Sequence, residues 1–217
     1  MKSLFDISVE QLQSEQIVEW GYSEELVPRS LNNFTSWIDE GHQGPLNYLS
    51  DHRKEIRKSL KEFFPDAKSS LSFLFDYRKA RKSKNSKFQI SSYATGFDDE
   101  DYHHWIAERL NRIGLEITKE KPDLEFKLSL DIHPVLERDM AYRSGLGWFG
   151  KNSMLINREF GSFNLIGSII FNQELNLDSQ KVETDHCGNC TACIDACPTE
   201  AILPGSRTLI AEKCISY

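Results

Sequence analysis

Four cysteines near the C-terminal end constrain this 217-residue chain more than any other feature. Cys187, Cys190, Cys193 and Cys197 follow the spacing C-x-x-C-x-x-C-x-x-x-C, and Pro198 comes directly after the last of them. In bacterial ferredoxins this spacing places three thiolates on one 4Fe-4S cluster and the fourth on a second cluster. The pattern therefore predicts an iron-sulfur module and, with it, electron transfer.

Two other uses of cysteine fit the sequence less well. Disulfide bonds need an oxidising compartment, and the N-terminal residues Met1–Asp6 lack the apolar segment of a secretory signal. A structural zinc site usually separates two C-x-x-C pairs by about a dozen residues or more, whereas all four thiols here lie between positions 187 and 197. Taken alone, Cys214 is typical of a small core residue.

The composition, 39% apolar and 27% charged, is that of an ordinary globular protein. No apolar run approaches the roughly 18 residues that a membrane span needs, so we expect a soluble, cytoplasmic protein. The formal charge of -7 argues against a nucleic-acid partner, yet the stretch from Arg78 to Lys87 holds six basic residues and no acidic one. Such a patch can contact phosphates, although a solvated surface loop explains it as well.

Helical and strand periodicities alternate along the chain, which predicts an α+β fold. We expect helices over residues 9–27, 51–64, 101–117 and 134–144, the last opened by Pro134. We expect strands over 69–77, 126–132, 153–156 and 163–171. The economical division is one main domain of residues 1–180 and a small module of residues 181–217.

A glycine-rich segment, Gly145-Leu-Gly-Trp-Phe-Gly-Lys-Asn152, precedes the cysteines. Three glycines within six residues permit close approach of the backbone to a ligand, and Trp148 and Lys151 are suited to stacking and charge pairing with it. A tight connection is the simpler alternative. The segment does not fit the dinucleotide fingerprint, because it follows a predicted helix and not a strand.

Taken together, these motifs resemble the epoxyqueuosine reductase family. The resemblance depends on Asp131-x-x-Pro-Val-Leu-Glu-Arg138, the Gly145–Asn152 segment, Cys187–Thr199 and Cys214–Tyr217. Gly44–Leu49, Arg57, Tyr93–Gly96 and Asp101–His103 match further landmarks of that family. The resemblance thus covers nearly the whole chain.

The resemblance implies a cobalamin-dependent oxidoreductase with two 4Fe-4S clusters, which reduces epoxyqueuosine to queuosine at the wobble position of tRNA, the last step of queuosine biosynthesis. It also implies a mixed-sheet cobalamin-binding domain akin to that of reductive dehalogenases, followed by a ferredoxin-like module. The expected partners are tRNA carrying epoxyqueuosine and a small electron-donor protein of the flavodoxin or ferredoxin type.

The resemblance also assigns roles to single residues. Asp131 is expected to be the general acid that protonates the departing epoxide oxygen, whereas capping a strand end is the plainer role for it. Cys187, Cys190 and Cys193 are expected on the first cluster, and Cys197 and Cys214 on the second. Arg57, Gly150 and Lys151 are expected near cobalamin.

One departure from the family concerns the thiols. Two 4Fe-4S clusters need eight thiolates, and this chain has five cysteines. We therefore expect either a fragment of a longer protein or incomplete clusters. Two other functions stay open: a ferredoxin-type electron carrier, which needs no catalytic acid, and a cobalamin-dependent reductase of a small molecule such as an organohalide.

Overall fold

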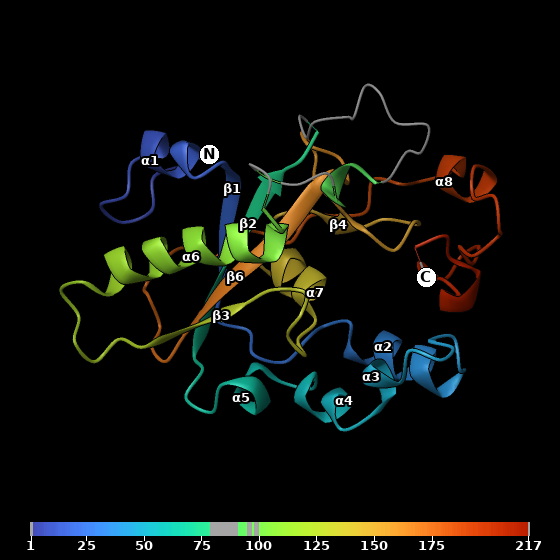
Figure 1. Cartoon of the computed structure of the whole chain (residues 1–217), viewed down its shortest axis with the longest axis horizontal. Coiled ribbons are helices and arrows are strands. Elements are labelled where there is room, and N and C mark those ends of the chain that lie inside the picture. The colour runs from blue at the N-terminus through green and yellow to red at the C-terminus, as the bar shows by residue number, and fades with distance from the viewer. Residues whose placement is uncertain (1, 79–90, 95–96, 98–99, 217) are drawn as a thin grey trace.

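A four-stranded sheet lies at the centre of the computed structural model, which describes residues 2–78, 91–94, 97 and 100–216. Its spatial order is β1-β2-β6-β3 (Figure 1). The strands are β1 (Ile17–Ser23), β2 (Ser69–Asp76), β3 (Phe126–Ser129) and β6 (Asn164–Phe171). A separate hairpin pairs β4 (Trp148–Phe149) with β5 (Leu155–Ile156).

The central sheet is antiparallel between all its neighbours, so the expectation of a mixed sheet is wrong. β2 and β3 run in the same direction, but they are not adjacent. β6 comes later in the sequence, lies between β2 and β3, and pairs antiparallel with both. The α+β class itself is confirmed.

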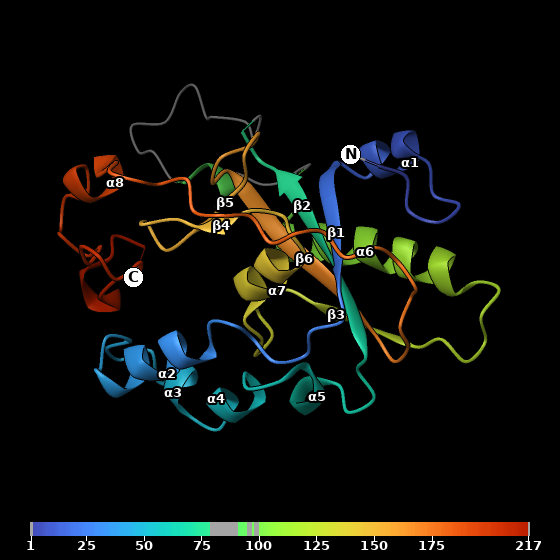
Figure 2. The ribbon, with the colours of Figure 1, turned by 180° about the vertical axis from the view of Figure 1, so that it is seen from behind.

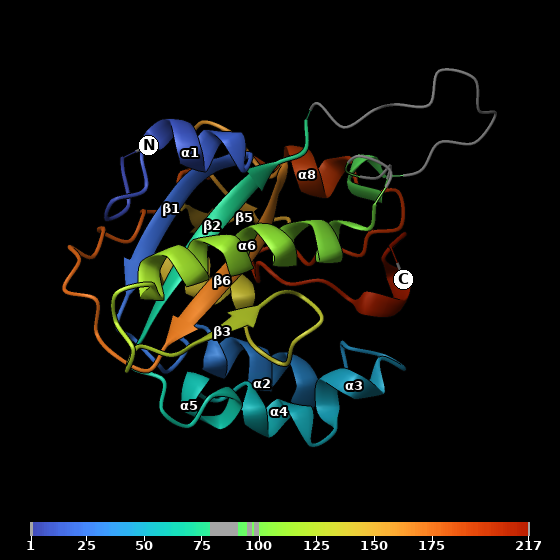
Figure 3. The ribbon, with the colours of Figure 1, turned by 60° about the vertical axis from the view of Figure 1, so that its left-hand side comes forward.

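Eight α-helices are found among the described residues. They are α1 (Val9–Ser14), α2 (Leu31–Asp39), α3 (Asn47–Ser50), α4 (Arg53–Ile56), α5 (Leu60–Phe63), α6 (Tyr102–Thr118), α7 (Glu137–Arg143) and α8 (Ala192–Asp195). Short 3-10 turns cover Ser92–Ala94 and Ala211–Lys213. In Figure 3, α6 lies along one face of the sheet, while α7 packs on the other face.

The long helix α6 supplies most of the core on its face of the sheet. Asp101 caps its N-terminus, because the Asp101 side chain accepts a hydrogen bond from the His103 N–H. Trp105, Ile106, Leu110, Ile113 and Ile117 are buried at near-helical spacing against the strands. The helix predicted over residues 101–117 is thereby confirmed, and its first turn carries Tyr102 and His103.

The opposite face of the sheet approaches α7 closely. A Cβ on Gly21 would lie 2.0 Å from the Ser144 carbonyl oxygen at the end of α7, so only glycine fits there. Ser72 and Ser168, on neighbouring strands, share a hydrogen bond of 3.0 Å at this face. Small residues therefore bring α7 directly onto the strands.

The helix predicted over residues 9–27 is wrong beyond its first turns. Gln16 has φ of 60°, a left-handed conformation that ends the helical path after α1. The chain then continues as β1, whose Trp20 and Tyr22 point into the core. The helix predicted over 51–64 is present only as two short turns, α4 and α5, whereas the strands predicted over 69–77 and 163–171 are confirmed.

The C-terminal segment lies beside α2 and α3 in both Figure 1 and Figure 2. Trp37 Nε1 donates to the Leu209 carbonyl at 2.6 Å, and the Ala211 N–H donates to the His42 carbonyl at 2.8 Å. Within the described part of the chain, no helix is long and apolar enough to cross a membrane. The boundary at residue 180 stays a prediction.

Candidate functional site

A cavity of about 450 Å³ lies between four segments of the chain. Its walls come from α2 to α4, from the stretch of residues 131–139 that leads into α7, from the β4–β5 hairpin, and from residues 207–211. This volume falls within the roughly 300–1,000 Å³ typical of small-molecule sites. Its apolar lining consists of Phe34, Trp37, Leu46, Leu49, Val135, Leu136, Phe149, Leu209 and Ala211.

Asp131 borders this cavity and is held by both of its carboxyl oxygens. The Tyr102 hydroxyl donates to Oδ2, and His103 Nε2 lies 2.7 Å from Oδ1. His103 Nδ1 in turn lies 2.6 Å from Asp101 Oδ1. The side chain of Asp131 is 39% exposed, so α6 fixes its direction while leaving it accessible to a ligand.

Tyr102 is suited to remain a neutral donor to Asp131. Burial raises the pKa of Tyr102, and the hydrogen bond to Asp131 raises it further, because the phenolate would face a carboxylate. Tyr102 also stacks on the His103 ring with centroids 3.9 Å apart. The sequence pattern included Asp101–His103 as a landmark but gave no role to these residues.

Arg57 follows α4 and lines the same cavity, with only 7% of its surface exposed. Its Nη1 donates to the Tyr48 carbonyl at 3.3 Å, and its guanidinium lies 5.8 Å from the centre of the Phe34 ring. Burial lowers the pKa of Arg57. Among the described residues it forms no ion pair, so it is a buried cation suited to an acceptor-rich ligand.

Glu137 is the site residue that the sequence analysis missed. It begins α7 and lines the cavity near Asp131. Its Oε2 is buried and has no hydrogen-bond partner in the part of the chain that the structure describes. Burial, with a smaller contribution from the negative charge of Asp131, raises the pKa of Glu137 to about 8.

Gly150 and Lys151 do not line this cavity. A Cβ on Gly150 would lie 2.4 Å from Ile156 Cδ1, so glycine lets the β4–β5 hairpin close. Lys151 Nζ donates to the carbonyls of Gly188 and Cys190 at 2.7 and 2.8 Å. Lys151 therefore holds the cysteine-rich segment, and its expected nearness to cobalamin stays a prediction.

The five cysteines are free thiols that the structure does not gather into one site. Among the described residues, no three His, Cys, Asp or Glu side chains form a group that could hold a metal ion. The Cys190 N–H donates to the Cys187 carbonyl at 2.9 Å, which closes a turn between the first two cysteines. Within the described part of the chain, the loop after Cys197 is the one that directs backbone donors at a sulfur.

Cys197 has the surroundings of a thiolate ligand. Its Sγ accepts the Ala201 N–H at 3.3 Å. Backbone N–H groups of Ile202, Thr199 and Ala201 lower the pKa of the Cys197 thiol, which favours the thiolate form that binds iron. The donor set, five thiols with backbone donors near one of them, is compatible with iron-sulfur ligation.

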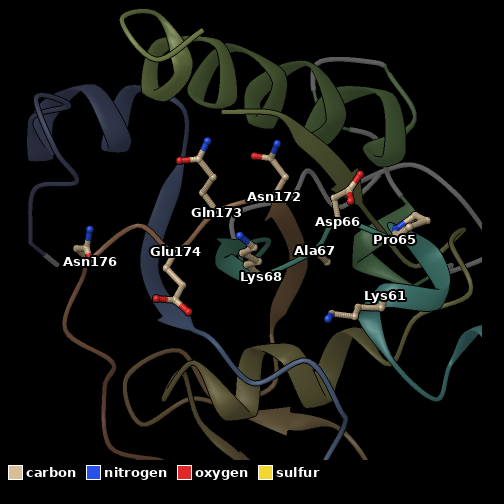
Figure 4. Close-up of a pocket in the computed structure, with 9 residues that line it drawn as sticks. All are labelled: Lys61, Pro65, Asp66, Ala67, Lys68, Asn172, Gln173, Glu174 and Asn176. Atoms are coloured by element: carbon tan, nitrogen blue, oxygen red, sulfur yellow. The ribbon is translucent and has the colours of Figure 1, made fainter. Parts of the chain in front are cut away.

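A second cavity, of about 770 Å³, lies where β2 begins and β6 ends (Figure 4). Its lining mixes lysines, carboxylates and amides: Lys61, Asp66, Lys68, Asn172, Gln173, Glu174 and Asn176, with Pro65 and Ala67. None of the residues predicted for the site lies there. Its lining carries both lysines and carboxylates, and we assign it no role.

Comparison with known proteins defines the class first. The family model of the 4Fe-4S binding domain matches residues 181–203, which include the four closely spaced cysteines. The chain therefore carries a 4Fe-4S binding motif.

The basic residues from position 79 onward in the Arg78–Lys87 stretch lie outside the described residues, and Arg78 itself pairs with Asp76 at 2.8 Å.

The main part of the chain points to one family. The family model "Epoxyqueuosine reductase QueG, DUF1730" matches residues 57–131. An epoxyqueuosine reductase from Leadbetterella byssophila is 37% identical over 196 residues, which are 90% of this chain and 61% of that protein. By sequence, the chain is similar to epoxyqueuosine reductases over about 60% of their length.

Solved structures agree with this relationship. The structure of epoxyqueuosine reductase from Streptococcus thermophilus superposes with a TM-score of 0.80 at 26% identity, over 95% of this chain and 55% of that chain. A crystal structure of epoxyqueuosine reductase with an epoxyqueuosine-modified tRNA stem loop gives a TM-score of 0.78 at 26% identity, over 96% of this chain and 55% of that one. The chain spans about 60% of the length of the curated relatives it matches.

Proposed function

We propose that this chain takes part in the reduction of epoxyqueuosine to queuosine in tRNA. The observation that carries the proposal is the position of Asp131, which borders the cavity and is fixed by Tyr102 and His103. A general acid needs such a fixed carboxyl within reach of a bound ligand. An electron carrier would need the cysteines but neither this carboxyl nor the cavity.

The lining of the cavity is chemically compatible with one part of cobalamin, a large macrocycle with amide and phosphate groups at its edge. The apolar lining offers contacts to a ring face, whereas Arg57 offers a buried cation to an anionic or carbonyl group. When bound, cobalamin would supply the reducing metal centre that breaks the carbon–oxygen bonds. Arg57, and by family resemblance Gly150 and Lys151, are proposed to lie near it.

We further propose that the cysteines hold iron. Cys187, Cys190 and Cys193 would serve a first 4Fe-4S cluster, and Cys197 with Cys214 a second. Lys151 connects this segment to the β4–β5 hairpin, whose Phe149 lines the cavity, so the cysteine-rich segment is tied to one wall of the cavity. A small flavodoxin- or ferredoxin-type protein is the proposed electron source, and the cytoplasm the proposed location.

A conversion assay tests the function directly. The 217-residue chain would be supplied anaerobically with iron, sulfide, cobalamin and a chemical reductant, then given tRNA that carries epoxyqueuosine. We expect queuosine in the digested tRNA, together with fewer than the roughly eight irons of two full clusters, since five thiolates are present. Protein that binds both iron and cobalamin yet forms no queuosine would contradict the proposal. Reduction of an organohalide in its place would favour the small-molecule alternative.

A further inference from the structure

Glu137 is a half-buried residue whose carboxyl group carries one buried oxygen that no other described group uses. Its Oε2 has almost no contact with solvent and accepts no hydrogen bond from any described residue. Burying an ionised carboxylate without a donor is costly, whereas the neutral carboxyl is far easier to bury. The wall of the cavity thus favours the protonated form of Glu137.

The charged neighbours do not reverse this preference. Arg138 lowers the pKa of Glu137, but its own Nη1 donates to the Ser153 carbonyl. Arg143, at the other end of α7, is paired with Asp139 at 2.5 Å. The other ionisable groups that line the cavity are Tyr48, Arg57, Asp131, His133 and Arg207, and none of them donates a hydrogen bond to Glu137 Oε2. Among these groups, the negative charge of Asp131 has the largest effect, and it raises the pKa of Glu137.

We propose that Glu137 is a second proton-holding group of the cavity, whose neutral carboxyl donates to an acceptor bound there. The catalytic use of this proton rests on the proposed function. When an epoxide is reduced to an alkene, both carbon–oxygen bonds break, a carbon–carbon π bond forms, and the oxygen leaves as water. This change takes two electrons, supplied by a one-electron reductant of low potential, and two protons. Asp131 accounts for one proton and Glu137 for the other.

Infrared spectroscopy tests the protonation state without any turnover. The full chain at pH 6.5, grown with 13C-glutamate to separate Glu from Asp, should show the C=O band of a neutral glutamic acid, and the band should vanish as the pH rises through about 8. Glu137→Gln should lack this band. Burial also raises the pKa of Glu19, so Glu19→Gln is the assignment control and should keep the Glu137 band. A parent protein without the titrating band, or a band that Glu137→Gln leaves intact, would overturn the proposal.

Substrate binding tests the donor role, again without turnover. Added tRNA that carries epoxyqueuosine, with no reductant present, should shift the Glu137 band to lower wavenumber, because a carboxyl that donates a hydrogen bond has a weaker C=O bond. A band that stays in place while the tRNA is bound would sink the donor role. The measurement depends only on the parent chain, so a failure of Glu137→Gln to fold would not prevent a decision.

Turnover separates this inference from the function on which it rests. In protein that forms queuosine, Glu137→Gln should lose on the order of a hundredfold in kcat, the usual contribution of a general acid, and should bind cobalamin within about threefold of the parent. Glu62→Gln, which changes an exposed side chain of α5, should match the parent. Equal turnover of parent and Glu137→Gln would reject the inference alone. A parent that is inactive despite bound iron and cobalamin would reject the proposed function, and the infrared result would then decide the protonation state of Glu137.

Discussion

The cavity and the cysteine-rich segment are organised in different ways. Around the cavity, other protein groups fix the side chains. Tyr102 and His103 hold Asp131. The C-terminal end of α7 packs closely on β1, which fixes the position of the helix and of Glu137 at its N-terminal end. In the cysteine-rich segment, the backbone is held by Lys151 and by turns, but the described thiols do not converge on one point. The fold thus fixes the Asp131 carboxyl with protein groups alone, whereas the proposed clusters would have to bring the thiols together when they bind.

Breaking the buried ion pair of α7 should have the largest effect, and that effect should fall on the cavity region. Asp139 accepts a hydrogen bond from Arg143 and also from the backbone N–H groups of Arg29 and Ser30, which lead into α2. Asp139→Ala leaves Arg143 buried without its partner, so the free energy of unfolding should fall by about 3–5 kcal/mol. Urea denaturation measures the loss, and exposed Asp178→Asn should leave the midpoint unchanged. A loss below about 1 kcal/mol would show that the cavity scaffold does not depend on this pair.

The titration of Glu137 should appear in the stability of the protein. Between about pH 5 and pH 8 the folded state holds a proton on Glu137 that the unfolded chain has released, because its pKa is raised to about 8. The free energy of unfolding therefore falls as the pH rises, by at most about 1.4 kcal/mol per pH unit from this group. Glu137→Gln removes this contribution, so the difference between parent and variant should favour the parent at pH 5 relative to pH 8. Parallel pH profiles in urea denaturation would contradict the assignment.

Asp131→Asn tests whether the pre-positioned acid is the proton donor. The amide is nearly isosteric, so fold, cobalamin affinity and iron content should be retained. Turnover of epoxyqueuosine in tRNA under chemical reduction should fall on the order of a hundredfold or more. Turnover within about threefold of the parent would move the search to His133, which lines the same cavity and whose pKa is lowered by burial.

Tyr102→Phe sharpens the account of how Asp131 is held. The substitution removes the hydrogen bond to Asp131 Oδ2 but keeps the ring that stacks on His103. A hydrogen bond to a charged group contributes about 1.5–3 kcal/mol, so kcat should fall about tenfold, with KM little changed. Tyr77→Phe, which also keeps its ring, is the matched control. A change in KM alone would show that Tyr102 contacts the substrate and does not orient the acid.

Lys151→Met should have the smallest effect and should fall on the cysteine-rich segment alone. It removes the two hydrogen bonds to Gly188 and Cys190 and preserves most of the side-chain length. We expect iron to be lost to a chelator a few times faster than from the parent, while the free energy of unfolding of the apo chain changes by less than about 1 kcal/mol. Lys61→Met controls for lost charge. A destabilised main domain would show that the two regions are not independent.

The sequence predicted the elements with one clear local signal. Asp101 followed by periodic apolar residues predicted α6, and the apolar runs before and after the loops predicted β2 and β6. The strand β1 was missed, because Ile17, Val18 and Trp20 also satisfy a helical spacing, and only the left-handed Gln16 breaks it. The pairing of the strands could not be predicted from the sequence either, since β6 takes its place between β2 and β3 only through tertiary packing.

The site was predictable where a motif carried it. The cysteine spacing indicated the 4Fe-4S motif, which the match over residues 181–203 confirms. Asp131 was singled out by its place in a motif, and its role stays a prediction. Glu137 stood in the same motif but had no signal of its own, because its burial and its unpartnered oxygen arise only when α7 packs beside α2 to α4.

The contact between Gly21 and Ser144 determines which wall of the cavity can open. With no room for a single added carbon atom, α7 cannot slide along the sheet, and Glu137 at its start moves only as the sheet moves. The opposite wall packs less deeply, since α2, α3 and α4 contain no buried residue and are tied mainly by hydrogen bonds from Ser30 to Asp139 and from Trp37 to Leu209. A large ligand would therefore enter by hinging of α2 to α4, and amide hydrogen exchange should be fast in these helices and slow in α7.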